Sequence, residues 1–255
     1  MVTSALVSDG RLLAQGLGEQ AVFRAAGDAA LLVSGVPAPF LNGIITARAS
    51  VDLADVNHLL DAAELKSIPH CVQIRPGCDP QILELLRRRG FTEDEATPLM
   101  VMQPAASDLA ARAIHPELAI RVIDPDEAGL HAAVGAAGFD APLELFEKFV
   151  TPNVLKQPGY RAYLGTVAGE PVTTALGVTA GEHVGVFDVA TPAQHRGRGY
   201  GAAITARAAL DGFDAGASFA YLQSSAAGYG IYQRLGFRTM ETWTVWLSPG
   251  SQSHS

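Results

Sequence analysis

Residues 196–201 read Arg-Gly-Arg-Gly-Tyr-Gly and separate an apolar stretch from an alanine-rich one. Glycine permits backbone angles that turn consecutive N–H groups into one concavity, and the start of a helix adds partial positive charge to them. Arg196 and Arg198 add cationic character to the same segment. Binding of an anion about the size of a diphosphate is the chemistry that this pattern favours.

Two other phosphate motifs are excluded by spacing. A P-loop ends on Gly-Lys-Ser/Thr, whereas this run closes on Gly201-Ala202-Ala203. A dinucleotide fingerprint needs G-x-G-x-x-G at the opening of a parallel βαβ unit, but the glycines here follow G-x-G-x-G and the strands before them are expected to be antiparallel. A turn that merely connects a strand to a helix is the remaining structural explanation. Alternating glycines between arginines at a helix start favour the binding site instead.

Residues 190–201 resemble the signature of the GNAT N-acetyltransferase family, in which Arg/Gln-x-x-Gly-x-Gly/Ala follows a strand and opens a helix. Arg196, Gly199 and Gly201 fill that pattern. Further along the chain, residues 231–237 resemble the second hallmark of the family, a helix that ends in Tyr-x-x-x-Gly-Phe. Two such motifs in the expected order make the resemblance specific for the part of the chain from 118 to 247.

The resemblance implies an enzyme that transfers acetyl from acetyl-CoA to a primary amine by direct attack. The end of the strand before the loop would pair with the pantetheine arm, and the amide of Val189 would hold the thioester carbonyl as it becomes an oxyanion. Backbone amides of residues 196–202 would hold the diphosphate. Tyr232 would protonate the departing CoA thiolate, with Tyr229 as the competing acid. The predicted cofactor-binding residues are Phe187, Val189, Ala190, Thr191, Arg196, Gly197, Arg198, Gly199, Tyr200, Gly201, Ala202, Ser225 and Tyr232, and the predicted catalytic residues are Tyr232 and Asp188.

Two positions depart from the family pattern. The family often has a general-base Glu where this chain has Gly185, so the commonest base is absent and the base is left open; Asp188, a charged residue among apolar neighbours in the same strand, is a candidate. Asp188 could equally bind the ammonium of the substrate, or cap loop amides. Ser225 stands where the family often has Asn; its hydroxyl can bond a pantetheine carbonyl or cap a helix. These departures leave a non-catalytic acyl-CoA-binding or sensing protein as the alternative function.

The elements that must position these residues follow the order strand, two helices, three strands, helix, strand, helix, strand from residue 118 onwards. The predicted strands are 118–123, 160–167, 171–178, 183–190, 218–223 and 239–247, and the predicted helices are 126–137, 142–150, 202–213 and 230–235. The last strand carries Trp243 and Trp246 on opposite faces, so one is expected in the core and the other at the N-terminal half or the acceptor.

The upstream half resembles a fainter copy of this unit. Its leucine-rich helix ends in Arg-Gly-Phe at residues 89–91, much as the later one ends in Leu-Gly-Phe, but no glycine-rich loop precedes the helix that begins at residue 51. The predicted fold class is therefore α/β (α+β): a GNAT fold with a mixed, mostly antiparallel sheet flanked by helices, repeated as a tandem pseudo-repeat. The predicted divisions are a degenerate domain 1–105, a linker 106–117, an N-acetyltransferase domain 118–247 and a flexible tail 248–255.

The composition of the chain restricts the classes of binding partner that we expect. The net charge of −8 argues against nucleic acid and mildly favours small cationic amines. The spacing of Cys71 and Cys78 fits neither C-x-x-C nor a zinc knuckle, so we expect buried thiols and no metal. No apolar run approaches roughly 20 residues, and the first residues lack a signal-peptide pattern, so we expect no membrane contact and a cytoplasmic location. The acceptor and the oligomeric state are not predicted.

Overall fold

The computed structural model describes residues 2–104 and 109–251. They form two compact units: residues 3–99 with 239–251, and residues 100–104 with 109–238, to which Val2 is also assigned. Each unit thus takes in a segment from the other half of the sequence. Residues 106–108 of the predicted linker and 252–255 of the predicted tail lie outside the described residues. The predicted division into domains stays a prediction.

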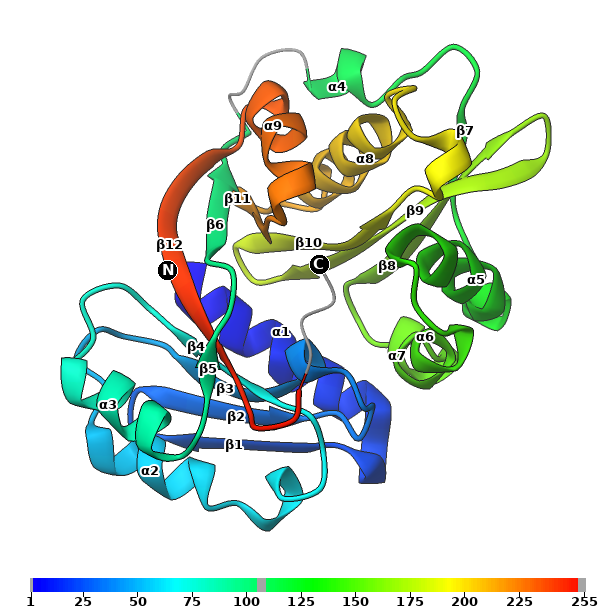
Figure 1. The fold of residues 1–255 in the computed structure, drawn as a ribbon. Helices are drawn as coiled ribbons and strands as arrows, with labels where there is room; N and C mark the ends of the chain where they lie inside the picture. The colour runs from blue at the N-terminus through cyan, green and yellow to red at the C-terminus, as the bar shows by residue number, and fades with distance from the viewer. Residues whose placement is uncertain (1, 105–108, 252–255) are drawn as a thin grey trace. The chain divides into compact units, whose positions relative to one another are not determined.

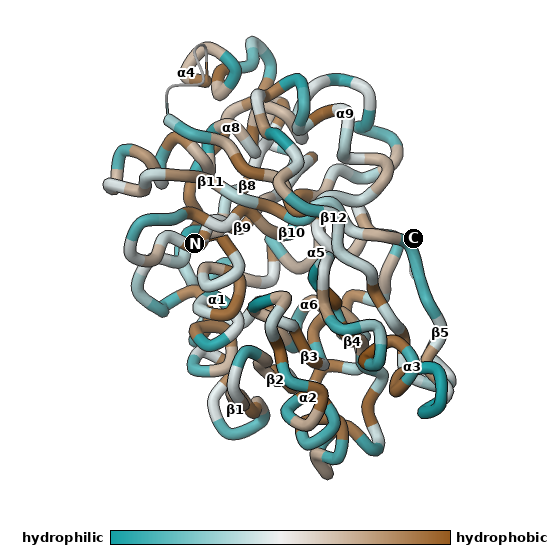
Figure 2. Tube along the Cα trace, turned by 90° about the vertical axis from the view of Figure 1, so that its left-hand side faces the viewer, coloured by the Kyte–Doolittle hydropathy of each residue, from teal (hydrophilic) through white to brown (hydrophobic). Residues whose placement is uncertain are grey.

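The first unit is a sheet with strand order β1-β2-β3-β4-β12, in which β3 and β4 are parallel and the other neighbours antiparallel. Its elements are α1 (Val2–Leu17), β1 (Val22–Ala26), β2 (Ala29–Val33), β3 (Asn42–Thr46), α2 (Leu53–Leu60), β4 (Cys71–Ile74), α3 (Pro80–Arg88), β5 (Thr92–Glu93) and β12 (Arg238–Leu247). Figure 1 shows α2 and α3 on one side of β1–β4 and α1 on the other. Hydrophobic colour follows β2 and β3 in Figure 2, whereas β5 is hydrophilic.

The second unit has the strand order β6-β11-β10-β9-β8-β7, with β10 and β11 parallel and β7 to β10 antiparallel. Its elements are β6 (Thr97–Met102), α4 (Leu109–Arg112), β7 (Ala119–Val122), α5 (Ala128–Phe139), α6 (Leu143–Phe149), α7 (Pro152–Leu155), β8 (Tyr160–Val167), β9 (Glu170–Ala180), β10 (His183–Ala190), α8 (Tyr200–Asp214), β11 (Phe219–Gln223) and α9 (Ala226–Leu235). Helices α8 and α5 lie on opposite sides of this sheet (Figure 1). The predicted fold class, a mostly antiparallel mixed sheet flanked by helices, is confirmed.

Local sequence explains the central part of this sheet. Ala168 and Gly169 both have positive φ, 50° and 86°, which is the backbone of a type I′ turn and closes the β8–β9 hairpin tightly. Helix α8 is rich in alanine, and a Cβ on Gly212 would lie 2.5 Å from Val184 of β10. These small residues let α8 pack close against β10, so the end of the strand lies beside the start of the helix.

Helices α3 and α9 end in the same hydrogen-bonded cap. Gly90 and Gly236 adopt left-handed φ values of 80° and 105°. The amide of Phe237 donates to the carbonyl of Tyr232 and that of Phe91 to Leu86, both at 3.0 Å, which is the 6→1 bond of a Schellman motif. The Gly-Phe pairs noted in the sequence are thus equivalent structural features, and they support the predicted repeat. Leu86 stands where the second unit has the Tyr232 phenol.

Both tryptophans of β12 are buried. Trp246 joins the apolar core of the first unit, which corresponds to one of the predicted alternatives. Trp243 is fully buried, and its indole N–H donates to the Glu241 carboxylate at 3.0 Å. The indole of Trp243 is therefore satisfied within the same strand.

Both cysteines are free thiols. Cys71 is buried, and burial raises its pKa to about 12; Cys78 is half-buried. Among the described residues, no three His, Cys, Asp or Glu side chains gather to hold a metal ion. In the same part of the chain, no helix has the length and apolar character needed to span a bilayer.

Candidate cofactor and catalytic site

The site begins where β10 and β11 separate. Their parallel pairing runs only from His183–Phe219 to Gly185–Tyr221, although β10 continues to Ala190. Just beyond the last pair, the rings of Phe187 and Tyr221 meet edge to face, with centroids 5.8 Å apart. Two strands that part in this way leave the free edge of β10 available to an extended ligand.

A β-bulge lies at the end of β10. The register with β9 passes from Phe187 directly to Ala190, so it skips Asp188 and Val189. Asp188 has φ = 50°, an unfavourable value for a residue with a side chain, and bulges of this kind re-aim side chains beside functional sites. Thr173 holds the end of the strand by donating to the Ala190 carbonyl at 2.8 Å. The bulge takes the residues predicted to bind the thioester and the amine out of the regular ladder.

The loop that follows β10 is rich in glycine and leads into α8. Gly197 and Gly199 have left-handed φ values of 76° and 86°, and α8 begins directly after Gly199. No side chain caps this helix start, so its first amides are not satisfied by a capping group. A Cβ on Gly201 would lie 3.5 Å from Thr191 Oγ1 and 3.9 Å from Val189 Cγ1. The first turn of α8 therefore lies directly against the bulged strand end.

The side chain of Arg196 binds protein carbonyls. Its Nε donates to Thr191 O at 3.0 Å and a terminal nitrogen donates to Gly138 O at 2.7 Å. A Cβ on Gly138 would lie 2.7 Å from the Ala190 Cβ, so the end of α5 packs closely on the same strand end. Arg196 thus ties α5 to the loop. Its guanidinium is thus used within the protein, and its main-chain N–H donates to the Ala193 carbonyl at 3.3 Å, whereas the side chain of Arg198 is exposed.

The predicted acid, Tyr232, lies on α9. Ser225 caps this helix by accepting the Gly228 N–H at 3.3 Å. The Tyr232 ring packs edge to face on Phe237 at 6.0 Å and against the same core cluster as Val189. Burial raises the pKa of Tyr232 to about 12, so the phenol keeps its proton throughout the neutral range. Tyr229 packs on the same cluster.

Asp188 is a carboxyl group whose pKa is strongly perturbed by burial. Burial raises its pKa from 3.8 to about 7, because the ionised carboxylate loses hydration at the bulge. Perturbed carboxyl groups in such a position are characteristic of catalytic sites. A group with this pKa can both accept and release a proton near pH 7.

Two residues that were not among the predicted site residues contact the loop on its other side. His115 and Glu117, which fall in the predicted linker, contact the loop and the first residue of α8. The Tyr200 side chain is fully buried and its hydroxyl donates to Glu117 at 3.3 Å, so only the main chain of Tyr200 can face a ligand. The sequence signal was weak: one His-Pro pair in a segment without periodicity.

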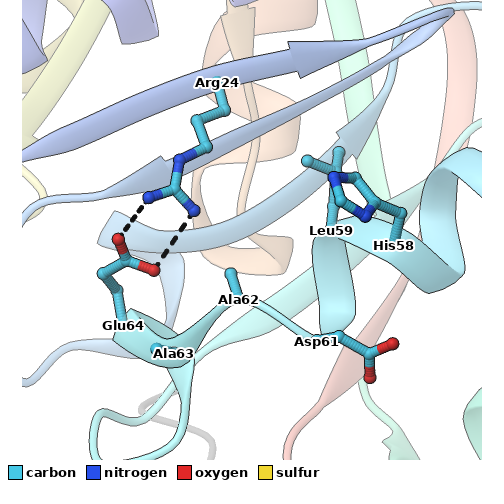
Figure 3. Close-up of a pocket in the computed structure, with 7 residues that line it drawn as sticks. All are labelled: Arg24, His58, Leu59, Asp61, Ala62, Ala63 and Glu64. Carbon is cyan, nitrogen blue, oxygen red and sulfur yellow. Dashed lines mark hydrogen bonds and ion pairs between the residues drawn. The ribbon is translucent and has the colours of Figure 1, made fainter.

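A separate cavity of about 300 Å³ lies in the first unit. Figure 3 shows Arg24 and Glu64 pointing toward one another across it, with His58 and Asp61 apart from this pair. The charge of Arg24 is already neutralised by Glu64, and the lining residues come from β1 and the α2 region. This cavity has none of the glycine-loop or strand-end features of the second unit.

Comparisons with known proteins agree with this geometry. Residues 164–240 match the family model of the acetyltransferase (GNAT) domain. A GCN5-related N-acetyltransferase from Kribbella flavida is similar over 96% of both chains, with TM-score 0.70 and 23% identity. A GCN5-related N-acetyltransferase from Sphaerobacter thermophilus is similar over 98% of this chain and 96% of its own, with TM-score 0.59 and 15% identity.

A tandem GNAT protein from the clavulanic acid biosynthesis pathway is similar over 92% of this chain and 85% of its own, with TM-score 0.59 and 14% identity. No curated protein matches the sequence. The matched segment 164–240 contains the bulge, the glycine loop and the Tyr-x-x-x-Gly-Phe cap. The chain therefore has a fold similar to that of these GNAT proteins, and its residues 164–240 match the acetyltransferase (GNAT) domain.

Proposed function

We propose that the second unit transfers the acetyl group of acetyl-CoA directly to a primary amine. The observation that carries this proposal is the junction of two features: the bulged end of β10 and the uncapped, glycine-led start of α8 lie against one another at Val189, Thr191 and Gly201. One suits a thioester with its pantetheine arm, and the other suits a diphosphate. CoA joins these two chemical groups in one molecule.

The roles of the residues follow from their positions. The main chain of residues 196–202 holds the diphosphate, and the free edge of β10 beyond the last β11 pair holds the pantetheine arm. The Val189 amide donates to the thioester oxygen, where a single well-placed donor contributes about 3 kcal/mol to the transition state. Tyr232 gives its proton to the CoA sulfur as the thiolate leaves. The Ser225 hydroxyl, which already caps α9, also contacts the pantetheine arm.

Asp188 is the proposed base. The substrate ammonium must lose a proton before its nitrogen can attack the thioester carbonyl, and a carboxylate with a pKa of about 7 accepts that proton near neutrality. Its position next to Val189 in the chain brings proton acceptance and oxyanion stabilisation to the same bulge. Gly185 stands where the GNAT pattern often has Glu, and glycine has no side chain that could accept the proton. Asp188 is the nearby carboxylate that we propose in its place.

A thiol-release assay tests the proposal. The protein is mixed with acetyl-CoA and each of a panel of amines, including polyamines, amino sugars and peptide N-termini, and free CoA is detected with 5,5′-dithiobis(2-nitrobenzoate). Release with at least one amine, together with a product one acetyl group heavier by mass spectrometry, is expected. Measurable CoA affinity without release for any amine would instead favour the acyl-CoA-binding or sensing function.

A further inference from the structure

We infer that His115, which lies outside the matched GNAT segment, is a positioning residue that aims the amide of Gly199 at the diphosphate. This inference rests on the proposed cofactor site. His115 Nε2 lies 2.9 Å from the Arg198 carbonyl oxygen, although the two residues are 83 positions apart in the chain. Arg198 stands between the two left-handed glycines of the loop.

The hydrogen bonds of His115 define its protonation. The Glu117 N–H donates to His115 Nδ1 at 3.3 Å, so the neutral ring carries its hydrogen on Nε2. Nε2–H then donates to the Arg198 carbonyl. Both ring nitrogens are thus occupied, one by its own turn and one by the loop, which holds the imidazole in one orientation.

A peptide unit is planar and trans, so its C=O and N–H point in opposite directions. By holding the Arg198 carbonyl on the outer side of the loop, His115 directs the N–H of Gly199 to the inner side. That amide immediately precedes the first turn of α8, whose N–H groups have no side-chain cap. Because glycine at φ = 86° has little torsional preference of its own, an external contact is needed to hold this orientation.

The segment that carries His115 is itself fixed. The imidazole meets the Tyr200 ring edge to face at 5.1 Å, and the Tyr200 hydroxyl donates to Glu117 at 3.3 Å. Leu118 packs with Tyr200 and Ala203 in one buried cluster. A Cβ on Gly199 would lie 3.7 Å from the His115 ring, an ordinary van der Waals distance. The contact therefore joins the loop to a segment that is packed against the first turn of α8, as a positioning residue requires.

The test compares His115→Ala and His115→Gln, which keeps an N–H donor, with His58→Ala, an exposed histidine of α2 as matched control. We expect His115→Ala to raise the CoA dissociation constant and the KM for acetyl-CoA about 5- to 10-fold, the effect of losing one hydrogen bond. Turnover at saturating acetyl-CoA should be unchanged. His115→Gln should recover most of the affinity, and His58→Ala should match the parent protein.

S-acetylpantetheine, which lacks the diphosphate, separates positioning from general damage. Its kcat/KM should be the same for His115→Ala and the parent protein. If His115→Ala lowers kcat/KM equally with acetyl-CoA and with S-acetylpantetheine, His115 has a purely structural role. If the CoA affinity is unchanged, the contact between His115 and Arg198 does not contribute to CoA binding. If the parent protein itself binds no CoA, the proposed function and this inference both fail. If it binds CoA but acetylates no amine, only the enzymatic function fails and the CoA affinities still decide the role of His115.

Discussion

The aromatic ring of Tyr232 lies directly against Gly228, one helical turn earlier in α9. A Cβ on Gly228 would lie 2.7 Å from Tyr232 Cε2 and 3.4 Å from its hydroxyl oxygen. The absence of a side chain at Gly228 is therefore what allows the ring to take this position. Phe237, held by the Schellman cap, packs on the ring as well. The phenol is thus fixed by a glycine and by the helix end that follows it.

Replacing the phenol tests its role as the acid. Tyr232→Phe should lower kcat about 10- to 100-fold, because the CoA thiolate then leaves without a proton, while CoA affinity changes little. Steady-state kinetics with calorimetric CoA binding measures both. Gly228→Ala should reduce kcat too by displacing the ring, whereas Gly230→Ala, whose Cβ meets only the flexible end of Arg234 at 3.3 Å, serves as control. Equal kcat for Tyr232→Phe and the parent protein would remove the acid role, with Tyr229 as the residue to replace next.

Asp188 predicts the pH dependence of the reaction. The base must be ionised to accept a proton, so kcat/KM should increase as pH rises through about 7, the raised pKa of Asp188. Asp188→Asn should lower kcat/KM by about 100-fold or more and abolish that inflection. A pH–rate profile from 5.5 to 9 measures both effects. An inflection that persists in Asp188→Asn would assign the titration to another group.

The Asp188 carboxyl group also makes the stability of the protein depend on pH, with stability falling as pH rises while kcat/KM increases. The folded protein keeps the Asp188 proton to a higher pH than the unfolded chain does, so this group makes stability decline as pH rises from about 4 to about 7. Asp188→Asn should therefore be more stable than the parent protein at pH 8 and closer to it at pH 4. Denaturation midpoints at the two pH values measure this difference.

Features that depend on residues adjacent in sequence could be predicted, whereas features that depend on a neighbouring strand could not. The glycine loop, the start of α8 and the Gly236 cap follow from residues adjacent in sequence, because positive φ values and missing caps are properties of short segments. The bulge at Asp188 was not predicted; a charged residue among apolar neighbours showed only that the position was unusual. The register that leaves Asp188 unpaired depends on β9 as well as on β10, so it cannot be predicted from the sequence of β10 alone.

Long-range contacts could not be predicted. Arg196 was expected at the phosphate, yet its side chain reaches the Gly138 carbonyl, 58 positions away. His115 reaches Arg198 across 83 positions. Neither partner has a sequence pattern that identifies it, since a backbone carbonyl acceptor is offered by any residue type. The guanidinium of Arg196 is therefore used to hold α5 against the loop.

His131 provides a stability test that is independent of catalysis. It is fully buried on α5, and among the described residues neither ring nitrogen has a hydrogen-bond partner. Burial lowers its pKa from 6.5 to about 4, so the unfolded chain takes up a proton first. The His131 contribution to stability should be complete above pH 6.5 and should fall by up to about 3 kcal/mol as pH drops toward 4, opposite in sign to the contribution of Asp188. His131→Leu should remove that component; parallel pH–stability curves for the variant and the parent protein would contradict it.

The packing of α5 on the strand end can be tested within one helix. Gly138→Ala would place a Cβ 2.7 Å from the Ala190 Cβ and 2.9 Å from the Thr191 amide, so we expect a loss of about 1–3 kcal/mol and reduced turnover. Gly129→Ala, in the same helix, meets no atom within 4 Å and should stabilise by a few tenths of a kcal/mol to about 1 kcal/mol. Thermal melts and steady-state assays compare the two. Identical behaviour of the two variants would show that α5 does not press on the strand end.

The path of β12 has a consequence for biosynthesis. The chain leaves the second unit immediately after the Gly236-Phe237 cap, and residues 244–247 then pair antiparallel with β4 of the first unit. The first unit therefore lacks this strand of its sheet until residues 244–247 have been synthesised. A contiguous N-terminal fragment of this protein would expose the edge of β4, and such unpaired edges favour aggregation.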